Sequence, residues 1–295
     1  MIANGIGRRG SSVSAQTAGT IAMAACAILW STAGLFIKLI NWEPFAIAGS
    51  RSAIASLFLW AWIRHPRFSF SRLQVLTALS YAATMILFVV ANKMTTSANA
   101  ILLQYGAPVY VAILGSVMLK EKPRTEHWVA LVAVCGGMLL FFMDSLKGGQ
   151  LVGDAVAALA GVTFALNIVL LRKQKDSSPL DSLLLGHIFT AAIAFALSLF
   201  FPAPVVTPKA IFAVLALGVV QIGLASVLFS YGIQRITALE SILTAVLEPL
   251  FNPVWVFLAT GEVPGLRSLM GGAIIIAAVL SSSIVSVRRT AKAVQ

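Results

Sequence analysis

The sequence predicts an all-α integral membrane protein with ten transmembrane helices, arranged as two inverted five-helix repeats. Three observations support this prediction. The chain is 59% hydrophobic and only 11% charged, whereas soluble domains carry about 25% charged residues. The apolar residues come in separate blocks of roughly 20, the length that spans a bilayer. Two stretches of the chain also match each other at a constant offset, which indicates an internal repeat.

Ten apolar blocks follow a polar segment that contains Arg8 and Arg9. This segment is not expected to open a secretory signal, because the next apolar run is longer than the roughly 7–15 residues of such a signal. Short connections that carry charges and turn-forming residues separate the blocks and leave no room for a soluble domain. The blocks cover residues 17–39, 44–63, 73–91, 96–119, 126–143, 153–171, 182–201, 209–231, 237–260 and 267–287.

The repeat is clearest in the fourth and ninth blocks. Residues 97–123 align with residues 238–264 at an offset of 141 without a gap, which pairs Pro108 with Pro249. Because each copy contains five helices, an odd number, the second copy must enter the membrane from the opposite side. The expected divisions are a tail at 1–16, repeats at 17–143 and 144–287, and a tail at 288–295.

The basic residues predict the orientation. Fifteen of the 21 fall at the helix ends and tails on the side that holds both termini, so both termini are expected in the cytoplasm. The net charge of +11 therefore reflects cytoplasmic loops, and nucleic acid is not an expected partner. Three basic residues at helix ends, Lys38, Arg172 and Arg235, are expected to extend their charges to the membrane surface.

The ninth block carries the strongest candidate for a functional side chain. Glu248 lies near the centre of this block, where a carboxylate costs roughly 2.5–3.5 kcal/mol to insert. Pro249 and Pro253 follow it, and each proline removes a helical hydrogen bond and frees a carbonyl. A second carboxylate, Glu240, lies eight residues before Glu248. The block is therefore expected to be a broken helix that contributes to a binding site.

Helical spacing places further polar and aromatic side chains at similar depth. We expect a cavity between the third, fourth, eighth and ninth helices, flanked by the first and sixth. Each of these side chains has a structural alternative, which is to pack or hydrogen-bond between helices. The candidate substrate-binding residues are Trp30, Tyr81, Phe88, Gln104, Tyr105, Asn167, Gln221, Glu248 and Asn252. The candidate helix-break and gating residues are Pro108, Pro249 and Pro253, and the intramembrane charges are Arg51, Glu240 and Glu248.

Other reactive residue types do not form a recognisable site. Arg51, in the second block, either reaches the surface or pairs with a carboxylate, and pairing is the favoured interpretation. The histidines are isolated in sequence, and those at 65 and 127 are expected to be solvated. Motifs for a nucleophile elbow, a phosphate loop or paired metal ligands are absent from the sequence. We therefore expect no catalytic residues, no bound metal and no cofactor.

Several short motifs resemble the drug/metabolite transporter superfamily, specifically its EamA-type members with two five-helix repeats. They are Leu29-Trp30-Ser31, the pair Pro44 and Arg51, Leu119-Lys120-Glu121, Leu247-Glu248-Pro249 and Gly261-Glu262. The resemblance extends from about residue 21 to residue 287. It implies a bacterial inner-membrane transporter, and for most members export of amino acids or other small metabolites. The fourth helix has Ala107 where the ninth has Glu248, so carboxylate chemistry is one-sided in this chain.

The first functional hypothesis is a secondary transporter that exports amino acids or similar metabolites by alternating access. Glu248 either binds a substrate amine or takes up a proton, which makes protons a candidate coupling ion. Its partners would be the small-molecule substrate and the lipid bilayer. The alternatives are an exporter of cationic drugs, polyamines or nucleobases, a membrane-embedded enzyme, and a passive channel.

Overall fold

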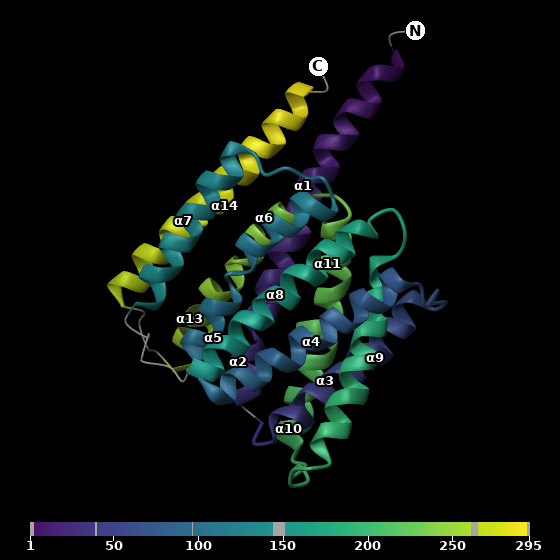
Figure 1. Ribbon diagram of the computed structural model, residues 1–295, viewed down its shortest axis with the longest axis vertical. Coiled ribbons are helices and arrows are strands. Elements are labelled where there is room, and N and C mark those ends of the chain that lie inside the picture. Colours follow the sequence, from purple (N-terminus) through teal and green to yellow (C-terminus); the bar gives the residue numbers. More distant parts are fainter. Residues whose placement is uncertain (1–2, 39, 96, 144–150, 261–264, 294–295) are drawn as a thin grey trace.

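The computed structural model describes residues 3–38, 40–95, 97–143, 151–260 and 265–293, and within these ranges it contains helices and connections but no strand (Figure 1). The helices are α1 (Ala3–Ser31), α2 (Ala33–Lys38), α3 (Pro44–Ile63), α4 (Arg72–Met94), α5 (Ser97–Gln104), α6 (Ala107–Met118), α7 (Thr125–Phe142), α8 (Leu151–Lys173), α9 (Pro179–Ser198), α10 (Pro208–Leu215), η1 (Ala216–Leu224), α11 (Ala225–Ile233), α12 (Ala238–Ala245), α13 (Leu247–Thr260) and α14 (Leu266–Ala293).

Helix starts follow local sequence signals. α3, α9 and α10 each begin at a proline, which fits the first turn because the missing amide would have no helical partner there. Ser71 caps α4 and Thr207 caps α10, since each side chain accepts a hydrogen bond from a backbone amide in the first turn. These caps fix where the apolar segments begin.

Seven helical segments within the described ranges are long and apolar enough to cross a bilayer. Two more apolar helices, Ala15–Ser31 and Thr125–Phe141, are shorter. The predicted number of ten transmembrane helices is therefore not established by these lengths, and it stays a prediction. The helical, membrane-spanning character is clear, because large apolar side chains such as Leu57 and Val117 are 73% and 74% exposed on the outer surface.

Two of the predicted helices are interrupted at equivalent positions. α5 ends at Gln104 and α6 begins at Ala107, while α12 ends at Ala245 and α13 begins at Leu247. The offset of 141 found in the sequence maps residue 105 onto residue 246, so both interruptions occur at the same place in the two repeats. In each case a proline follows within the first turn of the next helix, which explains the break.

The helices pack into one main bundle with a separate pair at its edge. α4 packs against α8 and α9, α3 packs against α9 and η1, and α1 packs against α11. α7 and α14 pack mainly against each other and lie side by side along one flank (Figure 1). The start of α1 and the end of α14 lie at the same end of the molecule (Figure 1), and we call it the termini end.

Glycines bring α7 and α14 into close contact. A Cβ atom added at Gly271 would lie 2.5 Å from the carbonyl oxygen of Gly137 and 2.6 Å from the amide nitrogen of Phe141. In the sequence, the adjacent glycines Gly136 and Gly137 and their counterparts in the last helix predict close packing of these two helices. A Cβ at Gly137 would lie 3.0 Å from the carbonyl oxygen of Gly271, whereas a Cβ at Gly136 would meet no atom within 4 Å. Of Gly136 and Gly137, only Gly137 is therefore needed for the helix contact.

This difference predicts opposite effects of two alanine substitutions. Gly271→Ala should force the helices apart and cost about 1–3 kcal/mol of stability. Gly136→Ala should be neutral or stabilise the protein by up to about 1 kcal/mol, because alanine favours helix. Thermal unfolding of both variants in the same detergent measures the difference. Equal melting temperatures for both variants would show that this helix contact does not depend on Gly271.

Candidate functional site

The two helix breaks meet in a direct polar contact. The buried hydroxyl of Tyr105, between α5 and α6, donates a hydrogen bond to the carboxylate of Glu248, in the first turn of α13. The same hydroxyl lies 3.3 Å from the carbonyl oxygen of Ala245. That carbonyl has lost its usual helical donor, because Pro249 has no amide hydrogen. Tyr105 therefore connects the interruption in the first half of the chain to the one in the second half.

A second polar group joins α4, α9 and α11. The hydroxyl of Tyr81 lies 3.1 Å from Nε2 of His187, and the same nitrogen lies 3.1 Å from Oγ of Ser226. The rings of Tyr81 and His187 meet edge to face at 4.8 Å between centroids. All three side chains are buried, and Nδ1 of His187 has no hydrogen-bond partner among the described residues.

The end of α1 contributes the Leu29-Trp30-Ser31 motif. The ring of Trp30 packs against Phe164 of α8 and Phe229 of α11, with centroid separations of 6.1 Å and 5.4 Å. Its carbonyl oxygen, in the last turn of α1, accepts a hydrogen bond of 3.4 Å from Nε2 of Gln221 in the π-helical segment η1. Ser31 accepts a 2.7 Å hydrogen bond from the indole of Trp255 in α13. The motif therefore links the end of α1 to four helical segments of the second half, α8, η1, α11 and α13.

Arg51 is buried on α3 with 6% of its surface exposed. Pairing with a carboxylate is the interpretation favoured from the sequence, but among the described residues Arg51 forms no ion pair. Instead, Nη2 of Arg51 lies 3.8 Å from the sulfur of Met85 on α4, and Nε has no partner among the described residues. The Glu248 carboxylate is close enough to interact with Arg51 electrostatically, without a direct ion pair.

Three other predicted substrate-binding residues, Asn167, Phe88 and Gln104, lie on α8, α4 and α5. Asn167 on α8 donates hydrogen bonds to the carbonyl of Thr77 and to the hydroxyl of Ser80 on α4, so it links two helices. Phe88 is partly buried on α4, and Gln104 is partly buried at the end of α5.

Two prolines with predicted gating roles are described. Pro108 is buried in the first turn of α6 and Pro249 in that of α13. The side chains of Asn252 and Pro253 lie outside the described part of the structure. Their predicted roles in binding and gating therefore stay predictions.

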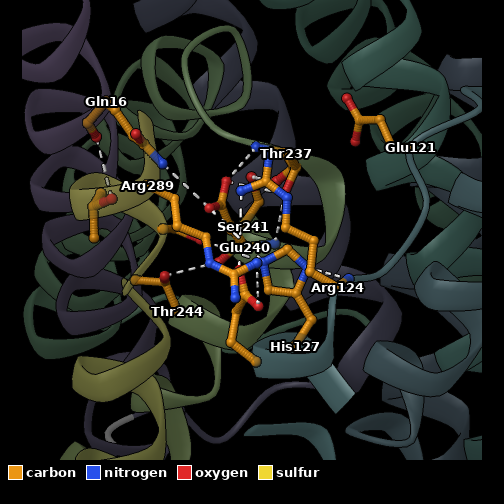
Figure 2. A network of polar contacts seen from close by, with 12 residues as sticks. Gln16, Glu121, Arg124, His127, Thr237, Glu240, Ser241, Thr244 and Arg289 are labelled. Carbon is orange, nitrogen blue, oxygen red and sulfur yellow. Dashed lines mark hydrogen bonds and ion pairs between the residues drawn. The ribbon is translucent and has the colours of Figure 1, made fainter. Parts of the chain in front are cut away.

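Glu240 belongs to a separate network at the termini end. It lies in the first turn of α12, where Oε2 accepts hydrogen bonds of 2.8 Å and 3.0 Å from the amide and hydroxyl of Thr237. Oε1 accepts a 3.3 Å hydrogen bond from Gln16 of α1 and lies 4.0 Å from Nε2 of His127 of α7. Figure 2 shows these side chains converging on Glu240. Its role is therefore to cap α12 and hold three helices together.

An ion pair lies at the same end of the molecule. Nε of Arg172, at the end of α8, lies 2.9 Å from Oε1 of Glu121, in the connection after α6. The other carboxylate oxygen of Glu121 accepts a 3.0 Å hydrogen bond from the amide of Ala238, at the start of α12. Nη1 of Arg172 donates a 2.8 Å hydrogen bond to the carbonyl of Ile233, at the end of α11. One pair of side chains therefore joins the ends of four helical segments.

A cavity of about 570 Å³ lies beside this ion pair. It is within the size range of small-molecule pockets, about 300–1,000 Å³. Its lining includes Glu121, Arg172, Glu240 and His127. The predicted cavity at the helix breaks stays a prediction.

Two predictions about this end of the molecule are wrong. His127 is 4% exposed rather than solvated, because α14 and α12 cover it. Arg172 is 9% exposed rather than reaching the surface, because Glu121 and a carbonyl satisfy its guanidinium inside the bundle. The buried position of His187 was also missed. Its position in an apolar block was the available signal, because a lone histidine at such a position needs a polar partner.

The side chains in these polar contacts do not have the composition of a metal site. Within the described residues, no group of three or more histidine, cysteine, aspartate or glutamate side chains could hold a metal ion. The polar contacts described above involve hydroxyls, amides, imidazoles and charged side chains. Such groups are suited to hydrogen-bonding an organic molecule.

Comparison with known proteins shows similarity to transporters along nearly the whole chain. The pattern of the EamA-like transporter family matches residues 17–143 and again residues 151–284. An uncharacterized transporter of Archaeoglobus fulgidus is 29% identical over 85% of this chain and 92% of its own length. The pseudopaline exporter CntI of Pseudomonas aeruginosa is 24% identical over 79% of this chain and 84% of its own length.

A solved crystal structure has a similar fold. It superposes with a TM-score of 0.80 at 19% sequence identity, covering 92% of this chain and 98% of the other. At this level of identity the similarity shows the fold and not the substrate.

Proposed function

Because this chain belongs to the EamA-like transporter family within the drug/metabolite transporter superfamily, we propose that it is a secondary transporter that exports amino acids or similar small metabolites. The transported molecule binds between the third, fourth, eighth and ninth helices of the predicted topology. Access to this site alternates between the two sides of the membrane as one repeat moves against the other.

The contact between Tyr105 and Glu248 is the observation that carries this proposal. Broken helices near the repeat interface are the usual construction of a transport site, because they present free backbone groups and helix ends to the substrate. Here the two breaks occur at matching positions of the two repeats and touch each other. A carboxylate with a tyrosine hydroxyl at this point can bind a protonated amine.

The proposed topology has ten transmembrane helices in two inverted repeats, at residues 17–143 and 144–287, with short tails on either side. Both termini lie in the cytoplasm and the membrane is the bacterial inner membrane. The termini end is then the cytoplasmic end, and the ion pair of Glu121 and Arg172 holds it closed. Protons are the coupling ion if transport is active.

The direction and the substrate class are supported by relatives rather than by the site alone. One relative is named as a pseudopaline exporter, and others are named as uncharacterized transporters. These names favour transport over an enzymatic reaction. Cationic drugs, polyamines and nucleobases are the alternative cargo, and the counter-flow experiment below distinguishes them.

Counter-flow in proteoliposomes tests the proposed function. Vesicles loaded with a mixture of unlabelled amino acids are diluted into buffer that contains one labelled amino acid. We expect saturable uptake of label that depends on the unlabelled pool inside, and no chemical change in the recovered label. Empty liposomes provide the background.

Each outcome has a definite meaning. Uptake that does not saturate and ignores the internal pool would indicate a channel. A chemically altered label would indicate an enzyme. Exchange of polyamines, cationic drugs or nucleobases but of no amino acid would keep the transporter and replace its substrate class.

A further inference from the structure

Arg51 is a buried cation that has no ion-pair partner among the described residues. The guanidinium carries five N–H donors and is always charged. Among the described residues, the structure offers it only the sulfur of Met85, a weak acceptor, at 3.8 Å, and leaves Nε without a partner. The helices around it are closely packed, since a Cβ at Gly218 of η1 would lie 3.0 Å from the carbonyl oxygen of Arg51. Such a charge is costly to bury unless an anion joins it.

The protein groups that face Arg51 are not available as that anion. On α4 the sulfur of Met85 lies 3.8 Å from Arg51, and Tyr81 of α4 and His187 of α9 interact with Arg51 electrostatically. On α13 it is Glu248, which interacts with Arg51 over a distance but is hydrogen-bonded to Tyr105. The Arg51 cation and the Glu248 carboxylate therefore interact electrostatically but do not form an ion pair with each other.

Unused hydrogen-bonding atoms lie on the adjoining helices. Nδ1 of His187 on α9 and Oε1 of Gln221 on η1 are buried and have no partner among the described residues. Both α9 and η1 pack against α3, the helix that carries Arg51. An arginine with one oppositely charged neighbour and spare polar atoms is the arrangement expected around a small zwitterion.

We propose that Arg51 binds the carboxylate of the transported molecule while Glu248 binds its amine, so that the site selects molecules that carry both groups. This inference rests on the proposed transport function. The planar guanidinium suits a carboxylate because two parallel hydrogen bonds can form. Binding of the substrate then supplies the counter-charge that Arg51 lacks. A decarboxylated amine leaves Arg51 unpaired and is therefore a poor substrate.

Matched pairs of probes test this selectivity in the same proteoliposomes. Each pair contains an amino acid and its decarboxylated amine: phenylalanine with phenethylamine, leucine with 3-methylbutylamine, and lysine with cadaverine. For at least one pair, the wild-type protein should exchange the acid about 30-fold or more faster than the amine. Arg51→Met should abolish that preference by losing exchange of the acid.

Thermal stability separates binding from a structural role. Removing an unpaired buried cation should leave the melting temperature of Arg51→Met unchanged or raise it. Arg172→Met is the matched control, because that buried arginine is paired, and its melting temperature should fall. A marked fall for Arg51→Met as well would show that Arg51 supports the fold and would overturn the proposal.

The remaining outcomes are also decisive. Equal exchange of acid and amine by the wild-type protein, or a preserved preference in Arg51→Met, would overturn the role of Arg51 while the transport function stands. Exchange of cadaverine without exchange of any amino acid would also overturn the role of Arg51 and leave the transport function standing. A complete lack of exchange with amino acids, amines, drugs and nucleobases would overturn the transport function, and the inference with it.

Discussion

Glu248→Gln is expected to reduce counter-flow of amino acids by about 100-fold, the effect of removing one partner from a buried charged contact. The glutamine keeps the size of the side chain and can still accept the hydrogen bond from Tyr105. It no longer carries the charge that attracts an amine. The loss should therefore appear in transport and substrate binding and not in the amount of folded protein. Initial rates of label uptake and thermal unfolding of the same preparation measure both quantities.

Glu240→Gln is the matched control. Both carboxylates belong to the same interrupted helix, but Glu240 caps the start of α12 at the termini end. A glutamine can replace glutamate in this kind of cap, so exchange should remain close to that of the wild-type protein. Retained exchange in Glu248→Gln with a lost dependence on pH would assign a proton to Glu248 instead of the amine. Unchanged exchange and unchanged pH dependence would remove Glu248 from the site.

Arg172→Gln is expected to open the termini end of the protein. Arg172 and Glu121 join α8, α11 and the start of α12 to the connection after α6. Loss of one partner from a buried ion pair costs roughly 3–5 kcal/mol. Because Glu121 is partly exposed, we expect the cost for this pair to lie near the lower value. The equilibrium between the closed and open states of the termini end should therefore shift towards the open state by tenfold or more, since each factor of ten corresponds to about 1.4 kcal/mol.

Spin labels on two different segments that line the cavity of about 570 Å³ at the termini end measure this opening. Lys122 and Gln234 both line the cavity and can be changed to cysteine after the native Cys26 and Cys135 are replaced by alanine. The distance distribution between the labels should shift to longer values in Arg172→Gln. An unchanged distribution would show that the ion pair does not hold this end closed.

A longer ion pair provides the comparison for Arg172. Arg124 lies 4.0 Å from Glu126, and the Arg124 side chain is 51% exposed whereas that of Glu126 is 8% exposed. Loss of Arg124 should cost little, because Glu126 keeps a second basic partner, Arg289, at 3.2 Å. Arg124→Gln should therefore leave the label distances as they are in the wild-type background.

The sequence predicts the repeat and the two helix breaks because these depend on local chemistry. A proline interrupts helical hydrogen bonding wherever it occurs, and the constant offset relates Pro108 to Pro249 without any knowledge of packing. Helical spacing also places Tyr105 and Glu248 at similar depth. It cannot show that the two side chains touch, because that depends on how the helices rotate and pack.

The contacts of the buried charges were harder to predict for the same reason. Arg172 and Glu121 lie 51 residues apart, at helix ends where basic residues commonly reach water. The nine-residue π-helical segment η1 also changes which faces of the eighth helix point inward, because its hydrogen bonds span five residues instead of four. The partners of Arg51 and His187 likewise depend on which helices pack together, which no periodic pattern records.

Reversible closure of the termini end is the most direct test of alternating access. The cysteine variant with Lys122→Cys and Gln234→Cys is reconstituted, cross-linked across the cavity by a short reducible dithiol reagent, and assayed by counter-flow. Exchange should fall to the level of empty liposomes and return after reduction, because this end must open in every transport cycle. Full exchange by fully cross-linked protein would contradict the account, since the substrate would then cross the membrane without opening that end.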